Sequence, residues 1–296
     1  MSGEDANREA SKAEALRARL NVDRPAIAMA AHNPLAAKLA AEAGFDAIWG
    51  SGFELAASYA VPDANILFPS VHLDMMRAIG EAQMAPVIAD LDTGFGNAVN
   101  VAYAVPHYAA AGVAAVVIED KTFPKDSSLR PGGRQQLVPI VEFQGKIAAA
   151  KAAAPMLVIA RTEALIAGLE QEEALRRGAA YVEAGADALL IHSKQKSPDE
   201  ILSFCRVWPG RAPLVLVPTS YPDLAFADIA ALGRVGLIIC GNHAIRAAVA
   251  AMRRVFAQIL ADGGLAAVER DIAPVADIFA LQGDALMRAL EKAYLR

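Results

Sequence analysis

The chain has 296 residues, 55% of them hydrophobic but only 6% aromatic, and it carries a formal net charge of -5. This apolar content, combined with 21% charged residues, excludes a disordered or fibrous chain. The acidic balance argues against nucleic-acid binding, and no uncharged apolar stretch reaches the roughly 20 residues of a membrane span.

The first 20 residues are charged and favour a helix, which predicts an N-terminal helical segment over 1–20 and not an apolar signal peptide. Cys205 and Cys240 lie among apolar neighbours, so we expect them to pack as free thiols in a reducing compartment. From these features we expect a soluble, cytoplasmic protein.

A repeated pattern organises the chain from residue 41 onward. Small residues lead to a glycine, which is followed by a short apolar run ending in polar residues. The glycine suits the end of a helix, and the apolar run suits a strand covered on both faces. The clearest copies span 41–51, 109–120 and 182–193, with a looser copy at 233–242.

Four further apolar runs alternate with these copies, and three of them follow a proline, which suits the first position of a strand. The resulting eight strands are predicted to end near Ala30, Gly50, Asp90, Glu119, Arg161, His192, Val217 and Cys240. Helices are predicted between them at 34–43, 70–83, 98–111, 142–153, 170–184, 197–206 and 223–232.

Eight alternating strand–helix units predict an α/β protein with a closed parallel (β/α)8 barrel of the TIM type. A doubly wound open sheet is the structural alternative, although it usually has fewer strands. No change in composition marks a linker, so we predict one domain over 1–296. The tail over 243–296 is too long for one barrel helix, and we expect a C-terminal helical extension that reaches a partner subunit.

Polar residues follow most of the predicted strands, at the end of a parallel barrel where active sites lie. Asp90 and Asp92 are two positions apart, so along a strand they point to the same side. Glu119 adds a third carboxylate from the next strand. Oxygen ligands of this kind favour Mg²⁺ or Mn²⁺, so we predict a metal site; a polar strand cap is the alternative.

Two further strand ends carry groups that suit an anionic substrate. The planar guanidinium of Arg161 fits a phosphonate, phosphate or carboxylate, or else a salt bridge to Glu163 or Glu119. His192 suits a phosphoryl oxygen or a proton transfer, with a structural role as the alternative. The long loop over 121–133 is predicted to be a lid or, alternatively, a solvated loop.

These residues, taken in order, resemble the phosphoenolpyruvate mutase/isocitrate lyase superfamily. The similarity runs from about residue 20 to 245. The motifs that carry it are Trp49-Gly50-Ser51, Asp90-x-Asp92-x-Gly94-x-Gly96, Glu119-Asp120-Lys121 with Pro124-Lys125, Arg161-x-Glu163 and His192-Ser193-Lys194. The resemblance implies a (β/α)8 barrel with its last helix exchanged between subunits, in a homo-oligomer built as a dimer of dimers. It also implies 2-oxo or 2-hydroxy acid substrates and a gating loop after the fourth strand.

The gating loop distinguishes the branches of this superfamily. Carbon–carbon lyases carry a Lys-Cys-Gly-His type sequence there, whereas this loop has no cysteine. Lys125, Ser128 and Leu129 match the Lys-x-Asn-Ser-Leu sequence of the mutases, but Ser127 replaces the asparagine. This departure favours hydrolysis of the carbon–phosphorus bond of 3-phosphonopyruvate to pyruvate and phosphate.

The resemblance also implies the roles of individual residues. Mg²⁺, with Mn²⁺ or Co²⁺ as alternatives, is expected at Asp90, with Asp92, Glu119 and Asp63 acting through water. Substrate-binding roles are implied for Trp49, Ser51, Gly52, Ser128, Leu129, Arg161 and His192. Catalytic roles are implied for Lys125, Arg161, His192, Thr122 and Ser127. Within this set, Lys125 senses loop closure and Thr122 or Ser127 orients the attacking water.

Three other functions remain open from the sequence. The first is the mutase reaction, which returns the phosphoryl group to the enolate oxygen. The second is a lyase or decarboxylase acting on oxaloacetate or a substituted malate. The third is a non-catalytic binder of small diacids, although such a binder has no need of a complete lid and metal set.

Overall fold

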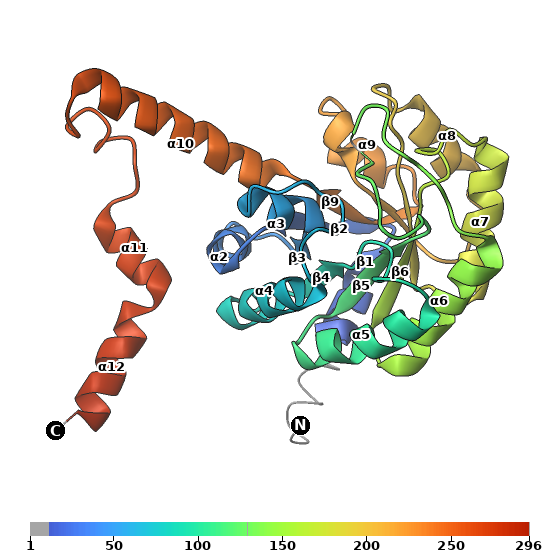
Figure 1. Ribbon diagram of the computed structural model, residues 1–296, viewed down its shortest axis with the longest axis horizontal. Coiled ribbons are helices and arrows are strands. Elements are labelled where there is room, and N and C mark those ends of the chain that lie inside the picture. The colour runs from blue at the N-terminus through green and yellow to red at the C-terminus, as the bar shows by residue number, and fades with distance from the viewer. Residues whose placement is uncertain (1–11, 129, 296) are drawn as a thin grey trace. The chain divides into compact units, whose positions relative to one another are not determined.

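The computed structural model describes residues 12–128 and 130–295. Its strands form a closed parallel barrel, as predicted (Figure 1). Neighbours in the chain pair side by side, and β2 also pairs with β9, which closes the sheet and excludes the doubly wound alternative. The barrel strands are β2 (Arg24–Ala31), β3 (Ala47–Gly50), β4 (Val87–Asp90), β5 (Ala115–Glu119), β6 (Leu157–Thr162), β7 (Ala188–Ile191), β8 (Leu214–Leu216) and β9 (Val235–Cys240).

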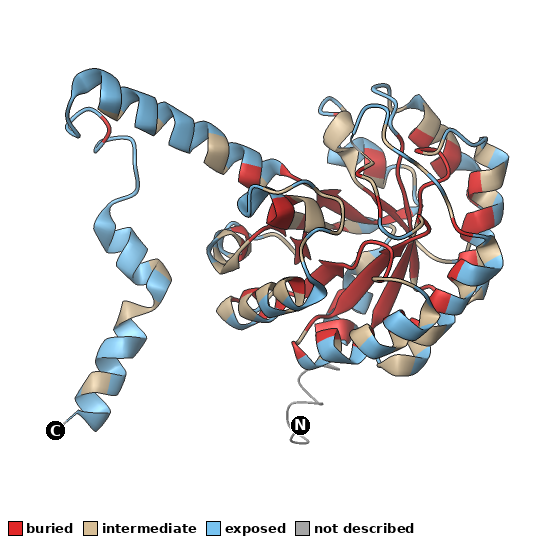
Figure 2. Cartoon of the chain, in the orientation of Figure 1, coloured by how far each residue is buried: buried red, intermediate tan, exposed pale blue. Residues whose placement is uncertain are grey.

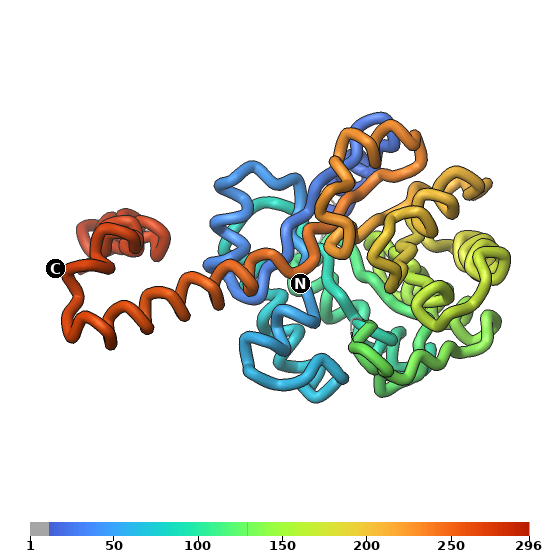
Figure 3. Tube along the Cα trace, turned by 90° about the horizontal axis from the view of Figure 1, so that it is seen from above, coloured from blue at the N-terminus to red at the C-terminus, as the bar shows by residue number. Residues whose placement is uncertain are grey.

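Helices connect successive strands and lie outside the barrel, and the colours in Figure 3 run around the ring in chain order. They are α2 (Pro34–Glu42), α3 (Gly52–Ser58), α4 (Pro69–Ala82), α5 (Ala98–Ala110), α6 (Ile140–Ala153), α7 (Gln171–Glu183), α8 (Asp199–Val207) and α9 (Phe226–Ala230). Each predicted strand end lies within one residue of the observed end. The sequence prediction missed α3 and a short strand, β1 (Leu20–Asn21), which pairs antiparallel with β2.

The predicted N-terminal segment is described only from residue 12; its earlier part lies outside the described residues. Residues 12–19 are helical. Arg19 donates to the backbone carbonyl of Asp46 at 2.5 Å, and Arg17 forms an ion pair with Asp187 at 2.8 Å. This helix therefore contacts the end of the barrel where β3 and β7 begin.

Two apolar layers alternate along the strands. One set of buried side chains fills the barrel interior, and the other packs between the strands and the helices. On β5, for example, Ala115 and Val117 belong to the inner set, while Val116 and Ile118 belong to the outer set. Figure 2 shows most of the barrel strands buried along their length, with β2 partly exposed toward its amino end. Side chains alternate between the two faces of a strand, so both faces of these strands are covered.

The repeated sequence pattern has a structural cause at the amino ends of the strands. Gly44 and Gly185 have φ values of 92° and 106°, a left-handed conformation in which a glycine avoids Cβ strain. The aspartates two residues later bind the neighbouring strand. Asp46 accepts the Ile27 N–H at 2.9 Å, and Asp187 accepts the Val158 N–H at 2.8 Å.

The chain divides into two compact units between Ala244 and Ile245. The second unit contains most of α10 (His243–Asp262), together with α11 (Val275–Gln282) and α12 (Asp284–Tyr294). Several large apolar side chains of this unit are exposed, including Phe256, Leu260 and Leu286. Within residues 12–128 and 130–295, no helix combines the length and the apolar character needed to cross a membrane.

Candidate active site

The row of side chains that points into the barrel changes from apolar to polar at the carboxyl ends of the strands. A residue two positions after an interior residue faces the same way along a strand. Four interior apolar residues are therefore each followed, two positions later, by an ionisable residue that faces the same way. The pairs are Ile88 and Asp90, Val117 and Glu119, Ile159 and Arg161, and Leu190 and His192.

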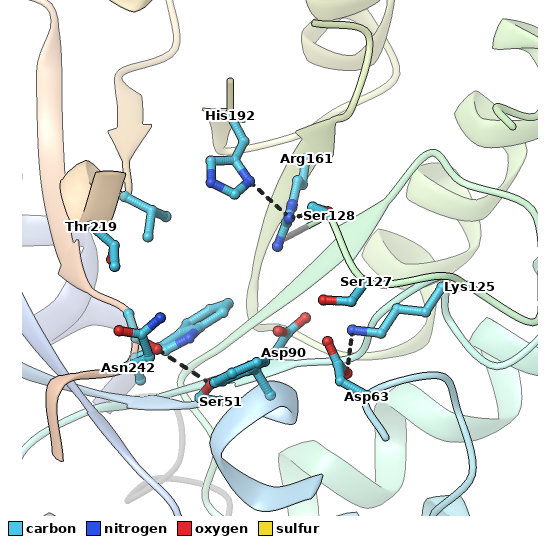
Figure 4. Close-up of a pocket in the computed structure, with 14 residues that line it drawn as sticks. Ser51, Asp63, Asp90, Lys125, Ser127, Ser128, Arg161, His192, Thr219 and Asn242 are labelled. Atoms are coloured by element: carbon cyan, nitrogen blue, oxygen red, sulfur yellow. Dashed lines mark hydrogen bonds and ion pairs between the residues drawn. The ribbon is translucent and has the colours of Figure 1, made fainter. Parts of the chain in front are cut away.

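A pocket opens at this end of the barrel (Figure 4). It is lined by Trp49, Ser51, Phe53, Asp63, Asp90, Lys125, Ser127, Ser128, Arg161, His192, Val217, Thr219, Gly241 and Asn242. Most of the residues predicted from the sequence therefore surround one space. Four predicted residues in the described part of the chain do not line the pocket: Gly52, Asp92, Glu119 and Thr122. The fifth, Leu129, is not among the residues that the structure describes.

Asp92 differs from the expectation that it extends the strand. β4 ends at Asp90, and Asp92 has a left-handed φ of 52°, with its backbone N–H donating to Asp90 Oδ1 at 3.2 Å. Gly52 packs against both carboxylates: a Cβ on Gly52 would lie 3.2 Å from Asp92 Oδ1 and 3.6 Å from Asp90 Oδ2. The role of Gly52 seen in the structure is thus to allow this close approach.

Lys125 brings the loop after β5 against the carboxylates. Its ammonium lies 2.9 Å from Asp63 Oδ1 and 2.5 Å from Asp92 Oδ1, and its side chain is buried. Burial alone would lower the pKa of Lys125, but Asp92 and Asp63 outweigh it and hold the pKa well above its usual value. Burial raises the pKa of the Asp92 carboxyl, although the Lys125 ammonium opposes the rise.

Glu163 organises the cationic side of the pocket. It lies two residues after Arg161 and is fully buried, with Oε1 2.6 Å from Arg161 Nε. Its other oxygen accepts the Ser128 hydroxyl at 2.5 Å and lies 3.1 Å from Lys121 Nζ. Burial would raise the pKa of Glu163, but Arg161 and Lys121 hold it well below its usual range. Glu163 is therefore a fixed anion that orients the guanidinium.

Arg161 also contacts two lining residues from other elements. Its Nη2 lies 3.1 Å from Ser128 Oγ and 3.1 Å from His192 Nδ1. Burial lowers the pKa of His192 and outweighs the opposing effect of Glu163, and the charge of Arg161 lowers the pKa further. A neutral imidazole is the form that can accept the Arg161 N–H at Nδ1. The three side chains present one arginine charge and two neutral polar groups to the pocket.

The Ser51 side chain has a structural role in addition to lining the pocket. It is the N-cap of α3 and accepts the Glu54 N–H at 3.2 Å. Its hydroxyl also lies 3.5 Å from the carbonyl oxygen of Gly241, which links the ends of β3 and β9. The N-cap position at the end of β3 therefore places Ser51 at the pocket.

The oxygen donors fit a hard divalent cation that retains several waters. Asp90 lines the pocket, and the buried Glu119, which does not line it, has an Oε1 that finds no hydrogen-bond partner within the described part of the chain. No ready-made cluster of three or more His, Cys, Asp or Glu metal donors exists among residues 12–128 and 130–295. One direct carboxylate with water-mediated neighbours matches the preference of Mg²⁺.

Several lining residues escaped the sequence prediction. Thr219 follows β8, and Gly241 and Asn242 follow β9, so a systematic reading of every strand end would have found them. Phe53 lies in α3, a helix that the prediction missed. Thr122 lies at the base of the loop, where its backbone N–H donates to the Gln136 carbonyl at 2.9 Å.

Comparison with known proteins shows to which protein family a barrel with this polar pocket belongs. The chain belongs to the phosphoenolpyruvate phosphomutase family, whose model matches residues 16–260. It is 66% identical to a phosphonopyruvate hydrolase from Variovorax sp. (strain Pal2), over 97% of this chain and 100% of the relative. It is 41% identical to a phosphoenolpyruvate phosphomutase from Tetrahymena pyriformis, over 90% of each chain.

A solved structure gives the same result for the fold. A crystal structure of a phosphonopyruvate hydrolase complex with oxalate and Mg²⁺ superimposes with a TM-score of 0.92 at 64% sequence identity. The superposition covers 96% of this chain and 99% of that chain. The superfamily resemblance predicted from the sequence motifs is therefore confirmed.

Proposed function

We propose that this protein hydrolyses the carbon–phosphorus bond of phosphonopyruvate, releasing pyruvate and phosphate. The observation that carries the proposal is the 66% identity to a phosphonopyruvate hydrolase along the full length of that relative. The pocket supports it independently, because carboxylates and a trio of anion-binding groups surround a single space.

The phosphonyl group is assigned to Arg161, His192 and Ser128. These side chains are already connected to one another at 3.1 Å, so little reorganisation is needed when an anion binds. Glu163 holds Arg161 through Nε, which leaves the terminal nitrogens directed toward the pocket. Phosphoryl transfer passes through a loose transition state, so positioning and electrostatics supply most of the catalysis.

The oxygens of the pyruvate part are assigned to the side of the pocket near Asp90 and Ser51. Mg²⁺ would be held by Asp90, with Asp63, Asp92 and Glu119 acting through water; Mn²⁺ or Co²⁺ would use the same oxygen donors. When bound, the cation supplies Lewis-acid stabilisation of the negative charge that develops on the pyruvate oxygens. Ser51 at the N-terminus of α3 would orient the substrate carboxylate.

The attacking water is assigned to Ser127. Of the two hydroxyl residues proposed for this role, Ser127 lines the pocket and Thr122 is outside its described lining. Ser127 belongs to the same loop as Lys125 and Ser128, so its place depends on the closed arrangement of that loop. As the carbon–phosphorus bond breaks, the water oxygen bonds to phosphorus, and the carbon that loses phosphorus takes up a proton, which the water supplies in the net reaction.

The mutase reaction is the second candidate, because the same Lys125 and Ser128 occur in the mutase loop sequence. Phosphorus NMR of the protein incubated with phosphonopyruvate and Mg²⁺ separates the two. We expect inorganic phosphate as the main phosphorus product. Phosphoenolpyruvate as the main product would replace the hydrolase proposal with the mutase.

We also propose a cytoplasmic homo-oligomer, a dimer of dimers in which the C-terminal helices are exchanged between subunits. Exposed apolar side chains on α10, α11 and α12, among them Phe256, Phe279 and Leu290, support an interface on this unit. Cys205 and Cys240 are free and buried, which suits a reducing compartment.

A further inference from the structure

Asn65 connects two loops that belong to different barrel strands. It lies in the segment between α3 and α4, outside the described lining of the pocket. Its side-chain Nδ2 donates to Asp92 Oδ2 at 2.7 Å, in the loop after β4. Its Oδ1 accepts the backbone N–H of Lys125 at 2.7 Å, in the loop after β5. One amide thus bridges the gating loop (121–133) and the neighbouring carboxylates of Asp63, Asp90 and Asp92, which we call the carboxylate cluster.

The conformation and chemistry of this position both favour asparagine. The φ of Asn65 is 55°, in the left-handed region that asparagine and glycine tolerate better than other residues. The bridge also needs a donor and an acceptor on the same short side chain. Asparagine supplies both, whereas an ionised aspartate of the same size only accepts.

The bridge fixes Lys125 at a second point. The ammonium is held by Asp63 and Asp92, while the backbone of the same residue is held by Asn65. Farther along the loop, Ser128 is attached to Glu163. The segment between these two attachments carries Ser127, so its placement over the pocket depends on both of them.

We propose that Asn65 is a positioning residue that latches the gating loop to the carboxylate cluster, coupling the orientation of Asp92 to the placement of Lys125 and Ser127. The expected effect of Asn65 on turnover rests on the proposed hydrolysis of phosphonopyruvate, whereas the attachment of the loop does not. The latch itself is a property of the protein before substrate binds. Asn65 acts through Asp92 and Lys125 and does not touch the substrate.

Two substitutions separate the halves of the bridge. Asn65→Gly removes both hydrogen bonds and keeps a residue that tolerates the left-handed backbone. Asn65→Asp keeps the acceptor for the Lys125 N–H but replaces the donor to Asp92 with a second carboxylate. Ala60→Gly is the matched control, since Ala60 lies in the same segment with a φ of 56°, is exposed and has no polar side-chain atom.

The experiment combines steady-state kinetics on phosphonopyruvate with hydrogen exchange of peptides from 121–137 in the full-length, substrate-free protein. For Asn65→Gly we expect kcat/KM to fall about 10- to 100-fold and exchange in this loop to accelerate. For Asn65→Asp we expect turnover to fall while loop exchange stays closer to that of the unsubstituted protein. Ala60→Gly is expected to change kcat/KM by less than about twofold, because it removes no hydrogen bond.

Loop exchange in Asn65→Gly that equals the exchange in Ala60→Gly overturns the latch. Accelerated exchange with unchanged kcat/KM also overturns it, because the bridge would then have no influence on the site. A failure of the proposed function is distinguishable. The unsubstituted protein would then release no phosphate from phosphonopyruvate, while the exchange comparison still tests the latch.

Discussion

The two ends of the barrel use aspartate in opposite ways. At the amino ends of the strands, Asp46 and Asp187 each accept a backbone N–H from the neighbouring strand, and Asp187 is also paired with Arg17 and Lys151. At the carboxyl ends, Asp90, Asp92 and Glu119 are all buried, and the charges of Asp90 and Glu119 act on Asp92. There, burial raises the pKa of both Asp92 and Glu119.

The aspartates at the amino ends therefore stabilise the fold, whereas burying the carboxylates at the carboxyl ends lowers its stability. Crowded carboxylates repel one another and lose hydration, whereas a single aspartate that satisfies a buried N–H stabilises the strands around it. Active sites of parallel barrels lie at the carboxyl ends of the strands. Substitutions at the two ends should therefore affect different measurable quantities.

The largest effect is expected from Asp90→Asn, which removes the charge of the carboxylate that lines the pocket. We expect kcat/KM for phosphonopyruvate to fall about 1000-fold or more, because the pocket loses its direct metal ligand. The midpoint of thermal unfolding should stay the same or rise, since one of several crowded negative charges is removed. Unfolding at a much lower temperature would show that Asp90 stabilises the fold and would remove the contrast between the ends.

A substitution at the opposite end should show the reverse behaviour. Asp187→Ala leaves the buried Val158 N–H without its side-chain acceptor. We expect the free energy of unfolding to fall by about 1–3 kcal/mol, measured by urea denaturation. The kcat should be unchanged at temperatures where the variant is folded. A fall in kcat comparable to that of Asp90→Asn would contradict the assignment of this end to stability.

An effect confined to acidic pH, and absent at neutral pH, is expected from His72, a buried histidine of α4 whose Nδ1 lies 2.8 Å from the Tyr108 hydroxyl. Burial lowers the pKa of His72 from 6.5 to about 4. Between pH 6.5 and pH 4, His72 is therefore protonated in the unfolded chain but neutral in the folded protein. Stability should fall by up to about 3 kcal/mol as the pH drops through this window.

His72→Gln provides the control for this pH dependence, because glutamine keeps an acceptor for Tyr108 but does not titrate. Urea denaturation at several pH values compares the two proteins. The slope of stability between pH 4 and 6.5 should be shallower in the variant. Equal slopes would mean that His72 is already protonated in the folded protein.

The features that depend on a regular repeat of residues along the chain could be predicted from the sequence. The ends of the strands and the inward direction of Asp90, Glu119 and Arg161 follow from apolar runs and from the two-residue alternation of a strand. Asp92 marks the limit of this reasoning. It lies beyond the strand, where a left-handed turn replaces the alternation.

The loop contacts had no comparable signal. Asn65 and Asp92 are 27 residues apart in sequence, and Asn65 and Lys125 are 60 apart. No local pattern relates such positions, because their contact depends on how three loops fold over the barrel. Thr219 and Asn242 were missed for a simpler reason: they follow the last two strands, where the polar residues are fewer and uncharged.

Hydrolysis of phosphonopyruvate at the carboxyl end of this barrel can be measured through its two products. The most direct test is to incubate the purified protein with phosphonopyruvate and Mg²⁺ and to quantify pyruvate and inorganic phosphate together. We expect equal amounts of both products, formed at the same rate and suppressed when the metal is chelated. Tight binding of phosphonopyruvate without metal-dependent release of either product would contradict it.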